Sequence, residues 1–305
     1  MAGKSPAFFY LNRLLIQISF IHLSLHLNKT RFISLAMPLT KILIAVKTYP
    51  NFSSKNEELA SIAGFREDGT WIRIYPIPLK KLSFEKQFKK YDWIEVDVEK
   101  NPDDIRTESF HLVNPDNPIK SIGHLDTENN WQERRKHVLK KVYTNFEELL
   151  DDAKNKTHPV SLAVFKPKKT VQFGNIRVPG EWDSTKKILL EKYNLYDDYD
   201  DEIETIRKLP YKFHFLFEDE KNEQYKMILD DWEAGNLFWN CMKKYENNEA
   251  RACDYVKRKF FDDYAKSKDV SFFLSTTFNS HKTAKNPFYV AGVFYPKFEH
   301  EISFF

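Results

Sequence analysis

Short apolar runs and alternating segments dominate the pattern of hydrophobic and polar positions from residue 40 onward. Ile42–Val46 is a continuous apolar run, which is typical of a buried strand. Residues 71–75 alternate after an Asp-Gly turn at 68–69, as expected for the second strand of a hairpin. Residues 211–217 alternate most clearly, with an aromatic side chain at every second position. The same patterns predict strands at 93–99, 160–165, 171–178, 270–276 and 288–295, and helices at 131–154, 224–244 and 249–266.

These elements predict an α+β fold. We expect a strand-rich, small-barrel-like N-terminal unit with one helix over residues 37–187. The stretch from 188 to 233 holds 14 acidic against 6 basic side chains, and its first part, 188–210, is expected to be an acidic linker. The C-terminal unit, 211–305, is expected to contain a mostly antiparallel sheet with two helices.

Residues 1–36 differ from the rest of the chain. They carry four basic side chains and no acidic one, and their apolar run is interrupted by polar and charged residues, which makes a poor membrane span. We favour a mis-assigned start, with Met37 as the true one; a cleaved signal peptide and a membrane anchor remain open. Without this leader, 43 basic face 44 acidic side chains, so the formal charge of +3 gives no evidence for a nucleic-acid partner.

Glycine and cysteine usage excludes several classes of site. Only 8 glycines are present, and neither a dinucleotide-binding fingerprint nor a P-loop occurs, so the sequence argues against a phosphate-cradling loop and leaves the cofactor unknown. The two cysteines, Cys241 and Cys253, are too few for a cysteine-based zinc site in one chain. They are expected to be packed thiols, which fits a cytoplasmic location.

One strand face is the leading candidate for binding. Trp71 and Tyr75 flank Arg73 on one side of the strand at 71–75, a pattern suited to stacking bases and pairing phosphate. Basic side chains that could extend this surface follow: Lys80, Lys81, Lys89, Lys90, Arg135 and Lys140. For the strand, the alternative is that it packs on both faces. For the basic residues of the helix at 131–154, the alternative is an ordinary solvated face.

Acidic side chains suggest a second kind of site. Asp231 and Glu233 flank Trp232 in the predicted helix at 224–244 and are weak candidates for a catalytic pair. The acids between residues 95 and 104 resemble a magnesium site in type but not in spacing, so we predict no metal site there. The alternative for both sets is an exposed acidic face.

Three strings resemble an uncharacterised family of bacterial hypothetical proteins. They are residues 71–77 (Trp-Ile-Arg-Ile-Tyr-Pro-Ile), 231–233 (Asp-Trp-Glu), and 286–288 with 294–296. The similarity begins near Met37 and runs to the C-terminal strand, and it implies no established activity.

The sequence therefore leaves three functions open. The first is a nucleic-acid-binding accessory protein that uses the face of Trp71, Arg73 and Tyr75, with DNA or RNA as the partner. The second is a protein-interaction module without catalysis, and the third is a metal-dependent enzyme that cleaves phosphodiesters. No membrane partner is expected for the folded part.

Overall fold

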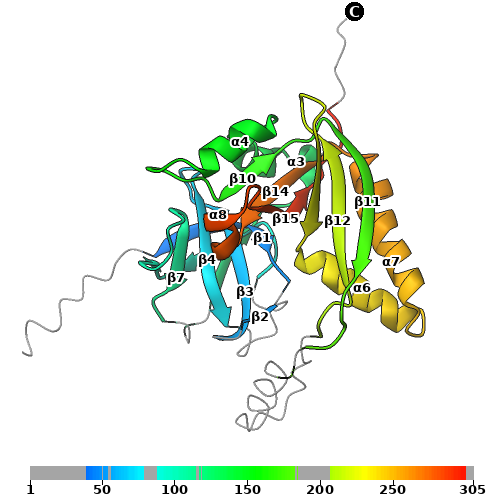
Figure 1. Ribbon diagram of the computed structural model, residues 1–305. Coiled ribbons are helices and arrows are strands. Elements are labelled where there is room, and N and C mark those ends of the chain that lie inside the picture. Colours follow the sequence, from blue (N-terminus) through cyan, green and yellow to red (C-terminus); the bar gives the residue numbers. More distant parts are fainter. Residues whose placement is uncertain are drawn as a thin grey trace, which may run out of the picture. The chain divides into compact units, whose positions relative to one another are not determined.

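The computed structural model describes residues 39–49, 51–53, 56–78, 88–114, 117, 119–182, 184 and 207–299 (Figure 1). The leader at 1–36, Lys80, Lys81 and most of the expected acidic linker lie outside these ranges. Both sheets described below belong to one structural unit, Leu39–Phe305.

The first sheet contains the strands before residue 125. In the described part of the chain these are β1 (Thr40–Lys47), β2 (Asn51–Ser53), β3 (Asn56–Phe65), β4 (Trp71–Pro78), β5 (Asp92–Val96), β6 (Val98–Lys100), β7 (Ser109–Leu112) and β8 (Lys120–His124). Their order is β6-β7-β4-β3-β1-β5-β8, with β2 beside β3.

This sheet curls back on itself. Only Asp97 separates β5 from β6, and its carbonyl accepts a hydrogen bond from Val113 N at 3.1 Å. The continuous segment 92–100 therefore pairs with β1 along its first half and with β7 along its second half. The predicted α+β class with a strand-rich, barrel-like first part is confirmed.

The second sheet contains β9 (Val142–Tyr143), β10 (Leu162–Phe165), β11 (Lys169–Arg177), β12 (Tyr211–Glu218), β13 (Gln224–Leu229), β14 (Ser271–Thr276) and β15 (Phe288–Phe294). Its order is β11-β12-β13-β15-β14-β10-β9, and only the pairs β13–β15 and β9–β10 are parallel. Because β9, β10 and β11 join this sheet, the two sheets divide the chain near residue 140. The boundary that we expected at residue 187 does not separate them.

Five α-helices accompany the sheets in the described residues. They are α3 (Glu128–Val138), α4 (Phe146–Ala153), α6 (Trp232–Lys244), α7 (Glu249–Lys257), which continues as the π-helix η1 (Arg258–Ala265), and α8 (Phe278–Thr283). The helix predicted at 131–154 is wrong as one element, because β9 and the Asn145 cap separate α3 from α4.

The helix predicted at 224–244 begins too early. Residues 224–229 form β13, in which Met227 and Leu229 point into the core at every second position. The helix itself starts after Asp231, whose Oδ1 accepts the Glu233 N–H at 2.7 Å as an N-cap.

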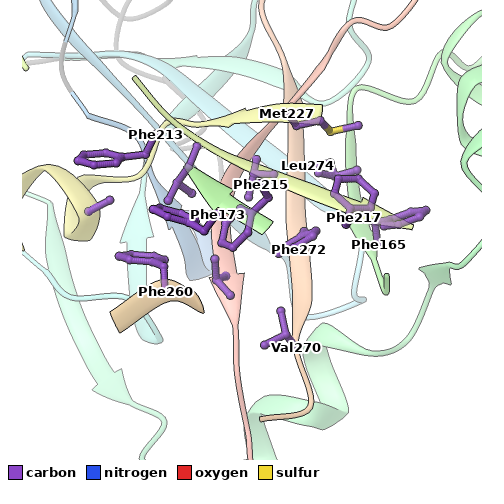
Figure 2. Close-up of a cluster of buried hydrophobic side chains, with 14 of the residues drawn as sticks. Phe165, Phe173, Phe213, Phe215, Phe217, Met227, Phe260, Val270, Phe272 and Leu274 are labelled. Atoms are coloured by element: carbon purple, nitrogen blue, oxygen red, sulfur yellow. The ribbon is translucent and has the colours of Figure 1, made fainter. Parts of the chain in front are cut away.

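Phenylalanines fill the core between the second sheet and its helices (Figure 2). Phe213, Phe215 and Phe217 of β12 are at most 1% exposed, as their alternation predicted. The ring of Phe173 on β11 stacks on Phe213 at 5.9 Å and on Phe260 of η1 at the same centroid distance. These contacts fix the position of η1 relative to the sheet.

A second apolar layer joins the two sheets. It includes Leu43, Ala45 and Ala63 from the first sheet and Leu162, Val164 and Ala291 from the second. The Trp71 ring on β4 belongs to this layer, with ring centroids 4.1 Å from Phe65 and 6.0 Å from Phe273. The second sheet therefore covers the face of β4 that carries Trp71.

Candidate functional site

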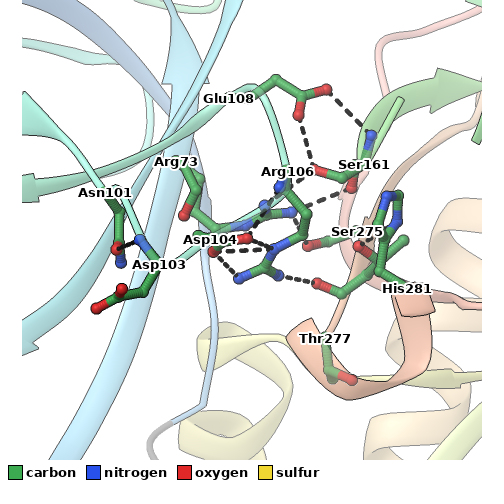
Figure 3. Close-up of polar contacts among 12 residues, drawn as sticks. Arg73, Asn101, Asp103, Asp104, Arg106, Glu108, Ser161, Ser275, Thr277 and His281 are labelled. Atoms are coloured by element: carbon green, nitrogen blue, oxygen red, sulfur yellow. Dashed lines mark hydrogen bonds and ion pairs between the residues drawn. The ribbon is translucent and has the colours of Figure 1, made fainter. Parts of the chain in front are cut away.

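The aromatic and arginine face expected to bind nucleic acid is buried. Arg73 is only 2% exposed, and Figure 3 shows its guanidinium between the two sheets. It donates hydrogen bonds to Ser161 Oγ (2.9 Å), to Ser161 O (3.1 Å) and to Ser275 Oγ (3.0 Å). Tyr75 is half-buried beside it. The alternative expected from the sequence, a strand packed on both faces, describes β4, and Arg73 is not available to a phosphate.

A second buried arginine completes this network. Arg106 is held by Asp104 in a forked ion pair and donates to Thr276 O at 2.6 Å. Burial alone would raise the pKa of Asp104, but hydrogen bonds from Arg106 lower it below its ordinary value. Burial, with the nearby charge of Arg106, lowers the pKa of Arg73 to about 10. The network is a polar clamp between the sheets.

The other basic candidates that the structure describes differ in exposure and pairing. Arg135 forms ion pairs with Asp269 at 3.4 Å and with Glu299 at 3.3 Å, so two carboxylates already balance its charge. Lys140 and Lys89 are exposed, whereas Lys90 is buried. Lys80 and Lys81 lie outside the described residues. The described basic candidates therefore do not share one exposed face, because Lys90 is buried and Arg135 is ion-paired.

The structure instead brings Lys90 to the two acidic candidates. Its Nζ lies 2.8 Å from Asp231 Oδ2 and 3.2 Å from Glu233 Oε2. The side chains of Lys90 and Asp231 are 7% and 1% exposed, while that of Glu233 is 46% exposed. Burial alone would lower the pKa of Lys90, but the two carboxylates outweigh it and raise that pKa above its ordinary value. This ion triad was not predicted, because 141 positions separate Lys90 from Asp231.

A pocket of about 350 Å³ opens beside this triad. It is lined by Lys47, Phe88, Lys89, Lys90, Trp232, Glu233, Asn236, Leu237 and Asn240. Glu233, Asn236 and Asn240 follow one another at helical spacing on α6, so they form a polar stripe along one side of the pocket. The sequence signals for this stripe are Glu233, which was already a candidate, and the two asparagines at helical spacing after it.

Lys47 is a further cation at the pocket. This residue ends β1 and is 4% exposed. Its ammonium donates to Phe88 O at 2.9 Å and lies 4.8 Å from the Phe88 ring centroid and 6.0 Å from that of Trp232. The pocket thus combines cations, aromatic rings, amides and one accessible carboxylate.

The acidic groups do not gather around one point. Within the described ranges, no three histidine, cysteine, aspartate or glutamate side chains are placed to share a metal ion. Asp104 is engaged by Arg106, and Glu99 lies 3.9 Å from His111 Nε2. The acids between 95 and 104 are therefore separate from Asp231 and Glu233.

Comparison with family models gives two overlapping matches, which together span residues 38–305. Residues 38–140 match a domain of unknown function, DUF8758, and residues 106–305 match a second one, DUF8757. The chain belongs to the DUF8757 family. The predicted resemblance to an uncharacterised family is confirmed, although its bacterial origin stays a prediction. The DUF8757 match contains Asp231 and Glu233, and the DUF8758 match contains Lys47 and Lys90, so the pocket takes residues from both.

No curated protein matches the chain. In the part of the chain that the structure describes, none of the helices has the length and apolar character needed to cross a membrane.

Proposed function

We propose that this protein binds nucleic acid by holding a single nucleotide unit in the pocket beside α6. The observation that supports this proposal is the mixture of side chains lining that pocket. Its volume of about 350 Å³ is at the small end of ligand sites and suits one nucleotide unit better than a folded partner. The proposal keeps the ligand class expected from the sequence and moves the site away from Trp71 and Arg73.

Cations at the pocket would favour the phosphate. Lys47, Lys89 and Lys90 contribute three positive charges, against the carboxylates of Asp231 and Glu233. Lys47 and Lys90 are themselves buried, so the field at the open side of the site comes from exposed Lys89 and from the accessible carboxylate of Glu233. A phosphate group near exposed Lys89 would gain from this field, and its affinity would fall with salt.

Aromatic and amide groups would favour the base. Trp232 and Phe88 offer ring surfaces at the pocket wall, and bases stack on aromatic side chains without strict sequence preference. The amides of Asn236 and Asn240 each supply donors and an acceptor, which match the edges of an unpaired base. Single-stranded nucleic acid is therefore the expected form of the ligand, since a paired base cannot enter a pocket.

Fluorescence anisotropy with labelled single-stranded oligonucleotides tests this proposal. We expect binding by the full chain that weakens from low to moderate salt and that falls about 10-fold in Asn240→Ala and in Lys89→Ala. The matched controls are exposed residues away from the pocket lining, Asn175→Ala on β11 and Lys257→Ala on α7, and both should bind as the wild type does. Equal binding by all four variants would contradict the proposed location.

Metal-dependent phosphodiester cleavage is a second candidate at the same place. It is supported by Lys90, which lies within 3.2 Å of carboxylate oxygens from both Asp231 and Glu233. Two carboxylates beside a lysine could hold a magnesium ion and stabilise a developing negative charge, provided that Lys90 moved away from Asp231. Cleavage of the labelled oligonucleotides with magnesium or manganese, abolished in Glu233→Gln, would support this function. If the oligonucleotides stay intact although the protein is saturated with them, cleavage is contradicted and binding is the remaining function.

A cytoplasmic location is part of the proposal, because Cys241 and Cys253 are both buried and free.

A further inference from the structure

The strand β11 forms one edge of the second sheet. It comes first in the strand order and, among the described strands, it pairs only with β12 (Figure 1). It has nine residues, whereas strands commonly have about 5–6. A long edge strand presents unpaired N–H and C=O groups, to which another chain can add a strand.

The ladder to β12 determines which backbone groups face outward. Val178 N donates to Pro210 O at 2.9 Å, and the register between the two strands is regular from residue 172 to 177. In an antiparallel pair, only every second residue directs its backbone groups at the neighbouring strand. Residues 174 and 176 therefore bond to β12. The N–H and C=O groups that point away from β12 are those of Phe173, Asn175 and Arg177.

The side chains of β11 do not protect this edge. Natural edge strands avoid pairing by means of central charges, prolines or bulges. Residues 170–176 contain neither a charge nor a proline, and Ile176 is 44% exposed. The one irregularity in the pairing with β12 lies between Thr170 and Gln172, near the start of the strand. The outward backbone groups come after it and are accessible to a further strand.

The charges around the edge indicate an acidic partner. Residues 166–177 contain four basic side chains and no acidic one. Arg177 is paired with Glu249 at 2.7 Å, whereas exposed Lys169 has no ion-pair partner in the described part of the chain. A second copy of this chain would bring the same basic residues to the edge. An acidic segment would instead pair with Lys169, so charge complementarity favours it over self-association.

An extended polypeptide fits this edge better than a nucleic acid does. Phosphate oxygens only accept hydrogen bonds, so they cannot pair with the outward carbonyls. A peptide strand supplies donors and acceptors at the spacing of the edge. We propose that β11 accepts an extended acidic segment of another protein as an added strand. This surface is distinct from the pocket beside α6, whose lining includes no residue of β11.

Hydrogen exchange of the backbone amides in the full chain tests the proposal. The probe is a synthetic peptide of alternating valine and threonine that ends in a run of glutamates, and the matched control peptide ends in lysines. We expect the amides of Phe173, Asn175 and Arg177 to exchange rapidly in the protein alone. The acidic peptide should slow their exchange about 10-fold or more, because strand addition pairs them, and the basic peptide should not.

Variants of β11 separate the backbone contribution from the charge. Asn175→Pro removes one outward N–H and should weaken binding of the fluorescein-labelled acidic peptide about 10-fold. Asn175→Ala keeps that N–H and should bind as the wild type does. Because the N–H of Asn175 does not bond to β12, the melting temperature of Asn175→Pro should stay close to that of the wild type. Lys169→Glu should weaken binding at low salt, whereas the control Lys257→Glu, on α7, should not.

Three results would overturn the proposal. The first is slow exchange of the three amides in the protein alone, which would show that this chain or a second copy already covers the edge. The second is equal protection by both peptides, or none by the acidic one. The third is protection of the same amides by a single-stranded oligonucleotide but not by the acidic peptide, which would make the edge a nucleic-acid surface.

Discussion

Replacement of Arg73 by alanine tests how the two sheets are joined. The guanidinium donates three hydrogen bonds, and their acceptors belong to Ser161 and Ser275, which are 0% and 2% exposed. A hydrogen bond to a charged group contributes about 1.5–3 kcal/mol net, and a buried acceptor left unpaired costs about 1–3 kcal/mol. Relief of repulsion from Arg106 and the remaining bonds from Ser161 to Glu108 reduce the loss. We expect the free energy of unfolding to fall by about 3–5 kcal/mol.

Urea unfolding followed by circular dichroism measures this loss. Arg73→Lys should be intermediate, because one ammonium cannot span Ser161 and Ser275 as the planar guanidinium does. The control is Arg177→Ala on β11, whose side chain is 68% exposed and pairs with Glu249 at 2.7 Å. An exposed pair is worth no more than about 1 kcal/mol. If Arg73→Ala loses no more stability than Arg177→Ala, the clamp does not stabilise the junction between the sheets.

Three further predictions concern α6 and its surroundings. Lys90→Met leaves the buried Asp231 carboxylate without its cation, so the free energy of unfolding in urea should fall by about 3–5 kcal/mol. Adding Asp231→Ser, which keeps a capping oxygen, should recover part of this free energy. No recovery would contradict the pairing of Lys90 with Asp231. Gly235→Ala would ordinarily stabilise a helix by about 1 kcal/mol, but its methyl group would overlap the Tyr49 ring, so the melting temperature should fall rather than rise. Burial, with the charge of Asp231, raises the pKa of Asp230 from 3.8 to about 7. The folded state therefore favours protonated Asp230, and the stability that this carboxyl contributes is complete below about pH 4 and is lost as the pH rises to about 7. Asp230→Asn should raise the melting temperature at pH 8 and leave it nearly unchanged at pH 4.

Period-two alternation and apolar runs carried most of the fold prediction. Alternation located β12 within one residue and β4 within three, because a strand that packs one face on a core shows that face directly in its sequence. Apolar runs located β14 and β15, which are buried along nearly their whole length, within one residue. The prediction failed at β13, a short strand that runs directly into the cap of α6 and was absorbed into the helix. The assignment of β9 to β11 to the second sheet depends on pairing between distant segments, which local patterns do not contain.

The candidate site was predicted only in part. Asp231 and Glu233 were singled out for a real local reason, since an aspartate in a helix interior is unfavourable, and the structure places Asp231 at the N-cap. Their partner, Lys90, was assigned to a basic surface instead. The face of Trp71 and Arg73 misled the prediction, because a buried arginine clamp and an exposed binding platform have the same sequence pattern. Only the second sheet, which lies across β4, distinguishes them.

Photocrosslinking tests the location of the ligand most directly. A single-stranded oligonucleotide carrying 5-iodouridine is irradiated with the full chain, and the attached peptide is identified by mass spectrometry. We expect crosslinks at Phe88 or within Trp232–Asn240, and we expect them to disappear when unlabelled oligonucleotide is added in excess. Crosslinks confined to other basic segments, such as residues 166–169, or none under conditions of binding, would contradict a nucleotide-binding pocket beside α6.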